Sequence, residues 1–77
     1  MNIIYYAKMT KTEDGYFGRV LGDANCCSSG ENYEEAIKNI RKGLELYLKY
    51  CKQVGKEPPK SLYVKGSRKI FLYTDSI

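Results

Sequence analysis

The sequence predicts an α+β fold in which one antiparallel sheet carries one long helix, in the element order βββαβ. A single strongly amphipathic segment runs from Gly30 to Gly55, and three strand-like segments separated by turn residues precede it. One further strand-like segment, residues 70–74, follows a connector that contains two prolines. With 77 residues the chain is expected to form one domain, residues 1–77, with a small core.

The predicted helix has capping signals at both ends. Asn32 can act as the N-cap, and Glu35 lies three residues later, as in a capping box. Gly55 can adopt the left-handed conformation that ends helices, and two prolines follow it. Between the caps, apolar residues recur at spacings of one, three and four and form one stripe. The stripe consists of Ala36, Ile37, Ile40, Leu44, Tyr47, Leu48 and Cys51.

The segments before the helix predict a three-stranded antiparallel meander. Residues 3–11 alternate in the manner of a half-buried strand, and the Asp-Gly pair that follows is a strong hairpin signal. Residues 16–21 form the return strand, in which Gly18 indicates a bulge or a close approach of the helix. After a second turn, residues 26–29 predict a short third strand that leads into the helix.

The segments after the helix are less regular. Residues 56–60 form a charged connector, and residues 62–64 are apolar but of uncertain type. A turn over residues 65–68 then leads into the last strand, residues 70–74.

The residue types do not predict an enzyme. The chain contains no His, so the commonest general base and metal ligand is missing. Cys26 and Cys27 are adjacent and leave opposite faces of a strand, so with Cys51 they do not make a zinc site. One of the pair is expected in the core, the other exposed, and Cys51 in the helix stripe. No glycine-rich phosphate loop is present, and no cofactor, metal or disulfide is expected.

The charges favour a modestly basic surface. Lys and Arg number 13 against 9 acidic residues, which gives a net charge of +4. Many of the cations follow one face of the predicted helix. They are Lys38, Arg41, Lys42, Lys49, Lys52 and Lys56. Such a row either remains solvated or tracks the phosphates of a nucleic acid, and the pattern leaves both open.

Several short motifs, in order, resemble those of the HicB-like antitoxin domain. They are Tyr5-Tyr6-Ala7 in the first strand, Asp14-Gly15-Tyr16 in the hairpin, Gly30 with Glu34-Glu35-Ala36 at the helix start, Asn39, and Leu44-Glu45-Leu46-Tyr47-Leu48. The Pro-Pro-Lys-Ser connector and the last strand also match the family pattern, so the resemblance covers most of the chain. The loop before the helix departs from that pattern, because it lacks the family's prolines and is shorter.

The resemblance implies a partial ribonuclease-H-like fold without nuclease activity. It also implies an oligomer that binds and masks a small ribonuclease toxin of the HicA type. The chain ends soon after the last strand, so no DNA-binding segment is expected and DNA is not an expected partner. No signal peptide and no membrane span are predicted, which favours a cytoplasmic protein. The alternatives are an oligomeric binder of another target, such as a phage or host defence protein or a small anionic ligand, or a nucleic-acid binder.

The sequence also predicts where copies of the chain or a partner would meet. Leu46 and Tyr50 lie off the helix stripe, beside Gly43, whose missing side chain leaves room for another surface. The last strand is a second candidate, since a small sheet must protect its open edge. Its expected interface residues are Ile70, Leu72 and Tyr73. A homodimer or a dimer of dimers is expected.

Overall fold

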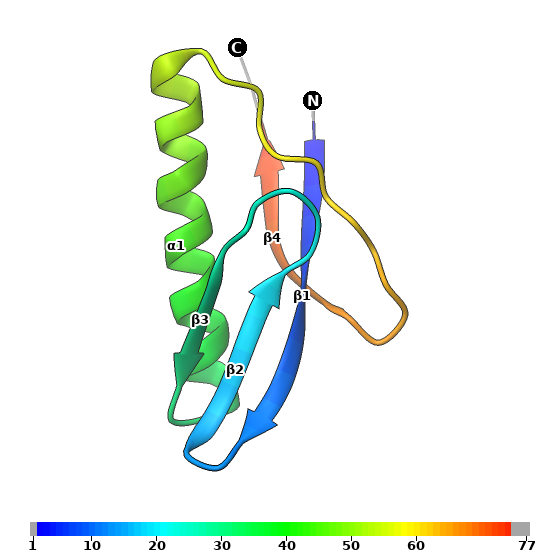
Figure 1. The fold of residues 1–77 in the computed structure, drawn as a ribbon. Coiled ribbons are helices and arrows are strands. Elements are labelled where there is room, and N and C mark those ends of the chain that lie inside the picture. The colour runs from blue at the N-terminus through cyan, green and yellow to red at the C-terminus, as the bar shows by residue number, and fades with distance from the viewer. Residues whose placement is uncertain (1, 75–77) are drawn as a thin grey trace.

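The computed structural model describes residues 2–74 and contains four strands and one helix in the predicted order (Figure 1). The elements are β1 (Asn2–Thr12), β2 (Gly15–Val20), β3 (Cys27–Gly30), α1 (Tyr33–Val54) and β4 (Arg68–Thr74). The sheet has the order β3-β2-β1-β4, and all its neighbouring strands are antiparallel. The predicted α+β fold of type βββαβ is therefore confirmed. Met1 and residues 75–77 of the predicted domain lie outside the described residues.

The capping residues determine where α1 begins and ends. The Asn32 side chain accepts a hydrogen bond from the Glu35 N–H at 2.8 Å, and the Glu35 carboxylate accepts one from the Glu31 N–H at 3.0 Å. At the other end, Gly55 has φ 73° and ψ 21°, the left-handed conformation that suits glycine. The Lys56 N–H then donates to the Cys51 carbonyl at 2.8 Å, which satisfies a carbonyl of the last turn. Both predicted caps are confirmed.

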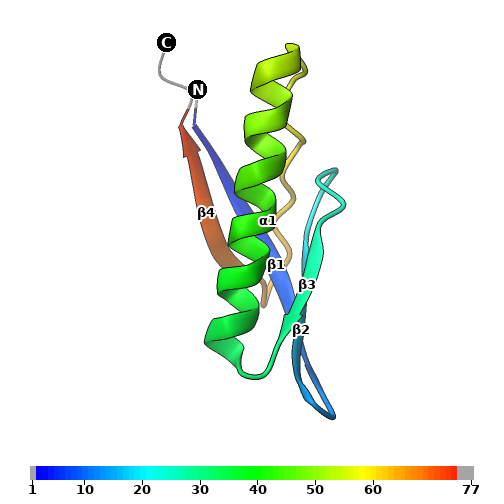
Figure 2. The same cartoon turned by 90° about the vertical axis from the view of Figure 1, so that its left-hand side faces the viewer.

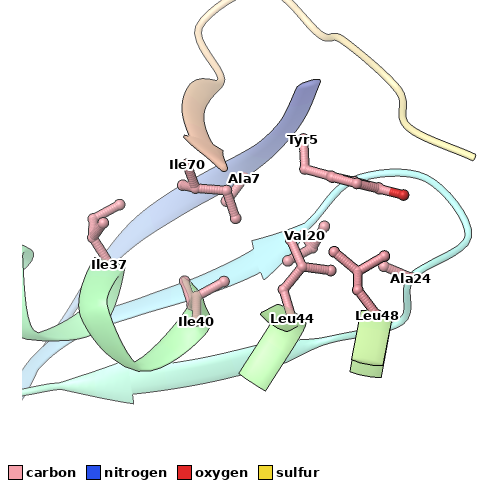
Figure 3. Packing of buried hydrophobic residues seen from close by; sticks show 9 residues of the cluster. All are labelled: Tyr5, Ala7, Val20, Ala24, Ile37, Ile40, Leu44, Leu48 and Ile70. Carbon is pink, nitrogen blue, oxygen red and sulfur yellow. The ribbon is translucent and has the colours of Figure 1, made fainter. Parts of the chain in front are cut away.

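The core lies between α1 and one face of the sheet, which we call the covered face (Figures 2 and 3). Tyr5 and Ala7 of β1 are fully buried there, and Leu44 of α1 packs with them. Gly18 of β2 lies where a side chain would run into Ile40 and Met9, so its role is a close approach of the helix and not a bulge. Glycine at this position lets α1 lie directly on the sheet.

A β-bulge is found instead in β4. Tyr5 pairs with Phe71 and Tyr6 pairs with Lys69, so Ile70 is the extra residue between the two pairs. The Ile70 side chain is buried in the core, and its carbonyl accepts a hydrogen bond from Arg41 Nε at 2.8 Å. The arginine thus satisfies a carbonyl at the bulge and joins α1 to β4.

The connector from Gly55 to β4 runs back along the sheet. α1 ends beside the start of β1, where the Tyr5 hydroxyl donates to the Pro59 carbonyl at 2.6 Å, whereas β4 begins opposite Ala7. On the way, the Ser61 hydroxyl donates to the Ile4 carbonyl at 2.6 Å. Tyr63 then packs edge-on against Tyr6, with ring centroids 4.9 Å apart. The apolar residues 62–64 therefore form no strand.

Candidate functional site

No metal-binding cluster is found among residues 2–74. These residues contain no group of three or more His, Cys, Asp or Glu side chains that could hold a metal ion, and no buried side-chain polar atom without a hydrogen-bond partner. In the same part of the chain, no helix has the length and apolar character needed to cross a membrane.

The three cysteines are free thiols in different surroundings. Cys51 is buried on α1, Cys26 packs against the core, and Cys27 is exposed, as the sequence predicts. Burial raises the pKa of the Cys26 thiol, and the neighbouring Cys27 raises it further. The Cys26 thiol donates to the Ala24 carbonyl, so it helps to close the loop between β2 and β3.

One flank of α1 faces the β3 side of the sheet. The Asn39 side-chain amide donates to the Ser29 carbonyl of β3 at 2.9 Å, so this flank lies next to β3. Gly43, Leu46 and Tyr50 follow Asn39 at spacings of four, three and four, so they continue the same row. Leu46 is 60% exposed and Tyr50 53%, and a Cβ added to Gly43 would meet nothing within 4 Å. We call these three residues the glycine flank.

The predicted interface residues of the last strand have different surroundings. Leu72 is 47% exposed, Tyr73 is half-buried against the core, and Ile70 is only 3% exposed. The Ile70 side chain is therefore taken up by the protein's own core, because the bulge turns it toward α1. A partner at this strand would meet Leu72 and the main chain.

The two candidate interfaces lie on opposite sides of the molecule. Arg41 bonds to β4 while Asn39 bonds to β3, and these strands are the two edges of the sheet. Figure 2 shows β4 on one side of α1 and β3 on the other. A single contact between two copies can therefore use the glycine flank or the β4 edge, and a dimer of dimers can use both.

A cationic groove lies between the first half of α1 and β4. It has a volume of about 230 Å³, and its lining residues are Tyr33, Glu34, Ile37, Lys38, Arg41 and Arg68. The Arg68 guanidinium lies over the Tyr33 ring, 5.2 Å from the centroid, which is within cation–π range. Lys38 and Arg41 belong to the predicted basic row, but Arg68 was predicted in a turn. Only the pairing of β4 with β1 brings it to the groove.

The rest of the basic row is exposed on α1 and just after it. Lys42, Lys49 and Lys52 are exposed, but they do not line the groove. The Lys56 ammonium donates to the Tyr47 hydroxyl at 3.4 Å and lies 5.8 Å from that ring's centroid. This hydrogen bond raises the pKa of Lys56. The basic row is thus divided: Lys38 and Arg41 line the groove, whereas Lys42 and Lys49 lie along the outer face of α1.

Acidic residues gather at the end of the molecule where α1 begins. The β1–β2 turn carries Glu13 and Asp14, and it packs against the start of the helix, since a Cβ on Gly15 would run into Gly30 and Glu31. A hollow of about 420 Å³ lies there, lined by Thr12, Asp14, Ser29, Gly30, Glu31 and Glu35. We call Glu13, Asp14, Glu31, Glu34 and Glu35 the acidic end. The sequence indicates helix-dipole and capping roles for the last three and a turn for the first two, and it predicts no convergence of these carboxylates. That prediction is wrong, because the hairpin turn packs against the junction of β3 and α1.

The other face of the sheet, the open face, carries exposed apolar side chains. Ile4 of β1 is opposite Leu72 of β4, and the two are 38% and 47% exposed. The connector adds Tyr63, which packs on Tyr6 and is itself exposed. α1 covers the opposite face, so these side chains have no helix over them (Figure 2).

Comparison with known proteins gives one partial match. A stretch of 42 residues, 54% of this chain, is 48% identical to a UPF0150 protein of Helicobacter pylori (strain J99). The match spans 58% of the length of that protein. No protein-family model matches the chain, and no solved structure matches it. The chain is thus similar over half its length to a protein whose name states no activity.

Proposed function

We propose that this chain is a non-catalytic protein-binding module of the HicB-like kind, and that it binds and masks a small basic protein such as a HicA-type ribonuclease toxin in the cytoplasm. The order and spacing of the family-like motifs support this proposal. The similarity to the H. pylori UPF0150 protein is compatible with it. The acidic end is the structural observation that carries the proposal.

The acidic end fits a basic partner in spite of the net positive charge of the chain. Five of the nine acidic residues lie in the hairpin turn and at the helix start. The positive end of the α1 dipole is screened there by Glu34 and Glu35, and Glu13 and Asp14 add charge from the turn. Complementary charge of this kind steers association and selects partners. A toxin that binds RNA presents a basic surface, which this end of the molecule would attract.

The test is co-purification with a HicA-type toxin, followed by calorimetric titration. The variant Glu13→Lys with Glu31→Lys, both at exposed positions outside the cationic groove, should weaken the complex at least tenfold, and raised salt should weaken the unmodified complex. The matched control is Lys42→Glu with Lys49→Glu on the outer helix face, which should leave affinity within about twofold or improve it. Absence of a complex with the toxin at micromolar concentration would contradict the proposal.

The glycine flank supports self-association as a part of this function. It is apolar, it contains no charged residue, and at Gly43 it leaves room for a second helix. Gly43→Glu should therefore reduce the mass measured by light scattering from dimer to monomer, with the circular dichroism spectrum unchanged. A monomer at tens of micromolar in the unmodified protein would contradict self-association and would leave toxin binding to its own test.

The outer helix face supports nucleic-acid binding as a second candidate. Lys42 and Lys49 lie seven residues apart on one face of α1, and both are exposed. Phosphate contacts predict an affinity that falls steeply with salt. Gel-shift assays with RNA and duplex DNA at 50 and 200 mM salt would detect it, and Lys42→Glu with Lys49→Glu should abolish it. This variant therefore separates the two candidates.

A further inference from the structure

We propose that the outer edge of β4 and the cationic groove together bind an extended peptide segment in which acidic and apolar side chains alternate. The inference rests on the proposed function as a protein-binding module, and it names a site and a partner chemistry on the side of the molecule opposite the glycine flank. The segment would add to the sheet as a fifth strand beside β4.

The main chain of β4 is available for such pairing. Ile4 and Leu72 form an antiparallel pair, and the Ile4 carbonyl accepts its hydrogen bond from Ser61, on the side away from β4. Ile4 and Leu72 are therefore a non-hydrogen-bonded pair. In an antiparallel ladder the two residues of a non-hydrogen-bonded pair both direct their N–H and C=O groups away from each other. The Leu72 N–H and C=O therefore point away from the sheet. No described strand lies beyond β4.

The covered-face side of this edge would take acidic side chains. Three cations, Lys38, Arg41 and Arg68, line the groove next to β4, against one carboxylate, that of Glu34. Arg41 is held at the edge by its Nε bond to the Ile70 carbonyl, and its terminal amino groups remain suited to a carboxylate. Arg68 is held by its stacking on Tyr33. Two of the cations are thus already positioned before a ligand binds.

The open-face side of the same edge would take apolar side chains. Leu72 and Ile4 present exposed apolar surface there, next to the outward main chain of β4. Successive side chains of an added strand alternate between the two faces of the sheet. Acidic residues would therefore meet the groove while the residues between them pack on Leu72. Lys69 also lies on the open face, opposite Tyr6, so the apolar preference holds for the Leu72 end of the strand.

The charge of the edge favours an acidic segment over a second copy of β4. A second β4 paired antiparallel across the start of the strand would bring its own Arg68 and Lys69 to an edge already lined by cations. Like charges placed opposite one another are unfavourable. An acidic segment instead neutralises the groove.

The probe is a fluorescein-labelled peptide of eight alternating Glu and Val residues with a flexible polar tail, followed by fluorescence anisotropy. Its control is a block peptide of identical composition, with four Glu before four Val. The alternating peptide should bind at least tenfold more tightly than the block peptide. Equal affinity of the two would show general charge attraction and overturn the inference.

Variants locate the site on the molecule. Lys38→Glu with Arg68→Glu should weaken binding at least tenfold, whereas Lys42→Glu with Lys49→Glu, which changes the net charge equally, should stay within about threefold. Leu72→Pro removes an outward N–H, which an edge strand tolerates, and should also weaken binding at least tenfold. Without any variant, hydrogen exchange at the Leu72 amide should slow on peptide addition. Unchanged exchange at saturating peptide overturns the inference even where Leu72→Pro does not fold.

The two proposals fail separately. A toxin complex that depends on Glu13 and Glu31, together with no peptide binding, would contradict the peptide site alone. Peptide binding without a toxin complex would sink the toxin assignment alone. If Lys38→Glu with Arg68→Glu changes the mass in light scattering and the peptide does not bind, the edge pairs with a second copy, which also overturns the inference.

Discussion

The two faces of the sheet differ although they are built from the same strands. Tyr5 of β1 is fully buried on the covered face, while its neighbour Ile4 is 38% exposed on the open face. Both are large and apolar, so composition does not separate them. The difference arises because a single helix can cover only one face of the sheet (Figure 2). The covered face therefore supplies the core, and the open face leaves large apolar side chains exposed.

The largest expected effect is that of a charge on the covered face. Leu44→Asp places a carboxylate at a fully buried position, at a cost of several kcal/mol. The whole stability expected for a chain of this length is about 4–12 kcal/mol. The variant should show no cooperative thermal transition by circular dichroism. Leu46→Asp, two residues later on the exposed glycine flank, is the control and should melt cooperatively. A cooperative thermal transition of Leu44→Asp like that of the unmodified protein would mean that Leu44 is not buried between α1 and the sheet.

The next largest effect is a loss of stability at high pH, which arises from a tyrosine buried on the covered face. Burial raises the pKa of the Tyr5 hydroxyl to about 12, with smaller contributions from Cys51, Tyr73 and Tyr47. An unfolded tyrosine ionises near pH 10, so the folded state favours the neutral form. The stability that depends on neutral Tyr5 is fully present below pH 10 and is lost as the pH rises through 12, by an amount on the order of 2–3 kcal/mol.

Urea unfolding between pH 9 and pH 12 measures this loss. Tyr5→Phe is the matched variant, because it removes the hydroxyl that donates to the Pro59 carbonyl and keeps the ring. Its stability should be lower at pH 9 and should fall less between pH 9 and pH 12 than that of the unmodified protein. Parallel pH dependence of the two proteins would assign the loss to other tyrosines.

A smaller effect is expected when glycine is replaced by alanine at two positions with different surroundings. Gly18→Ala forces a methyl group against Ile40 and Met9 on the covered face and should cost about 1–3 kcal/mol. Gly43→Ala meets open space on the outside of α1 and should stabilise the protein by up to about 1 kcal/mol, since alanine favours helix. Thermal melts should therefore shift in opposite directions. A stabilising Gly18→Ala would show that the helix does not lie directly on β2.

The smallest effect is expected on the open face. Leu72→Thr keeps a side chain suited to a strand and changes a residue that is already half exposed. The free energy of unfolding should change by no more than about 0.5 kcal/mol. Chemical denaturation checks this, and Ile70→Thr, two residues earlier in the core, should cost clearly more. A large loss for Leu72→Thr would mean that the open face is covered in solution.

Local signals were sufficient for the elements themselves. The capping box and Gly55 predicted both caps of α1 at the residues where the structure has them, and the Asp-Gly pair predicted the first hairpin. The short third strand was predicted one residue early, because a four-residue strand has too few positions to fix its register. Of the candidate surfaces, the glycine flank was predicted because helical spacing alone separates Leu46 and Tyr50 from the buried stripe.

The surfaces made by distant residues could not be predicted in this way. Ile70 was placed at an interface because its strand reads as an apolar run, whereas the bulge turns its side chain into the core. Arg68 reaches the groove only through the pairing of β4 with β1. Glu13 and Asp14 join the helix start only because the hairpin packs against the junction of β3 and α1. Each depends on a register or a contact between segments, for which a single sequence carries no local signal.

The sequence by itself determined the identity and order of the strands and the helix, the helix caps and the apolar stripe of α1. The physical reason is that hydrogen bonding within a turn or a helix and the periodicity of side chains act between residues close in the chain. Only the tertiary structure decided that β4 pairs with β1 at the sheet edge, that the glycine flank and the β4 edge lie on opposite sides, and that acidic and basic residues gather at separate places. These features follow from how the segments pack together, since burial and pairing act between residues far apart in the chain.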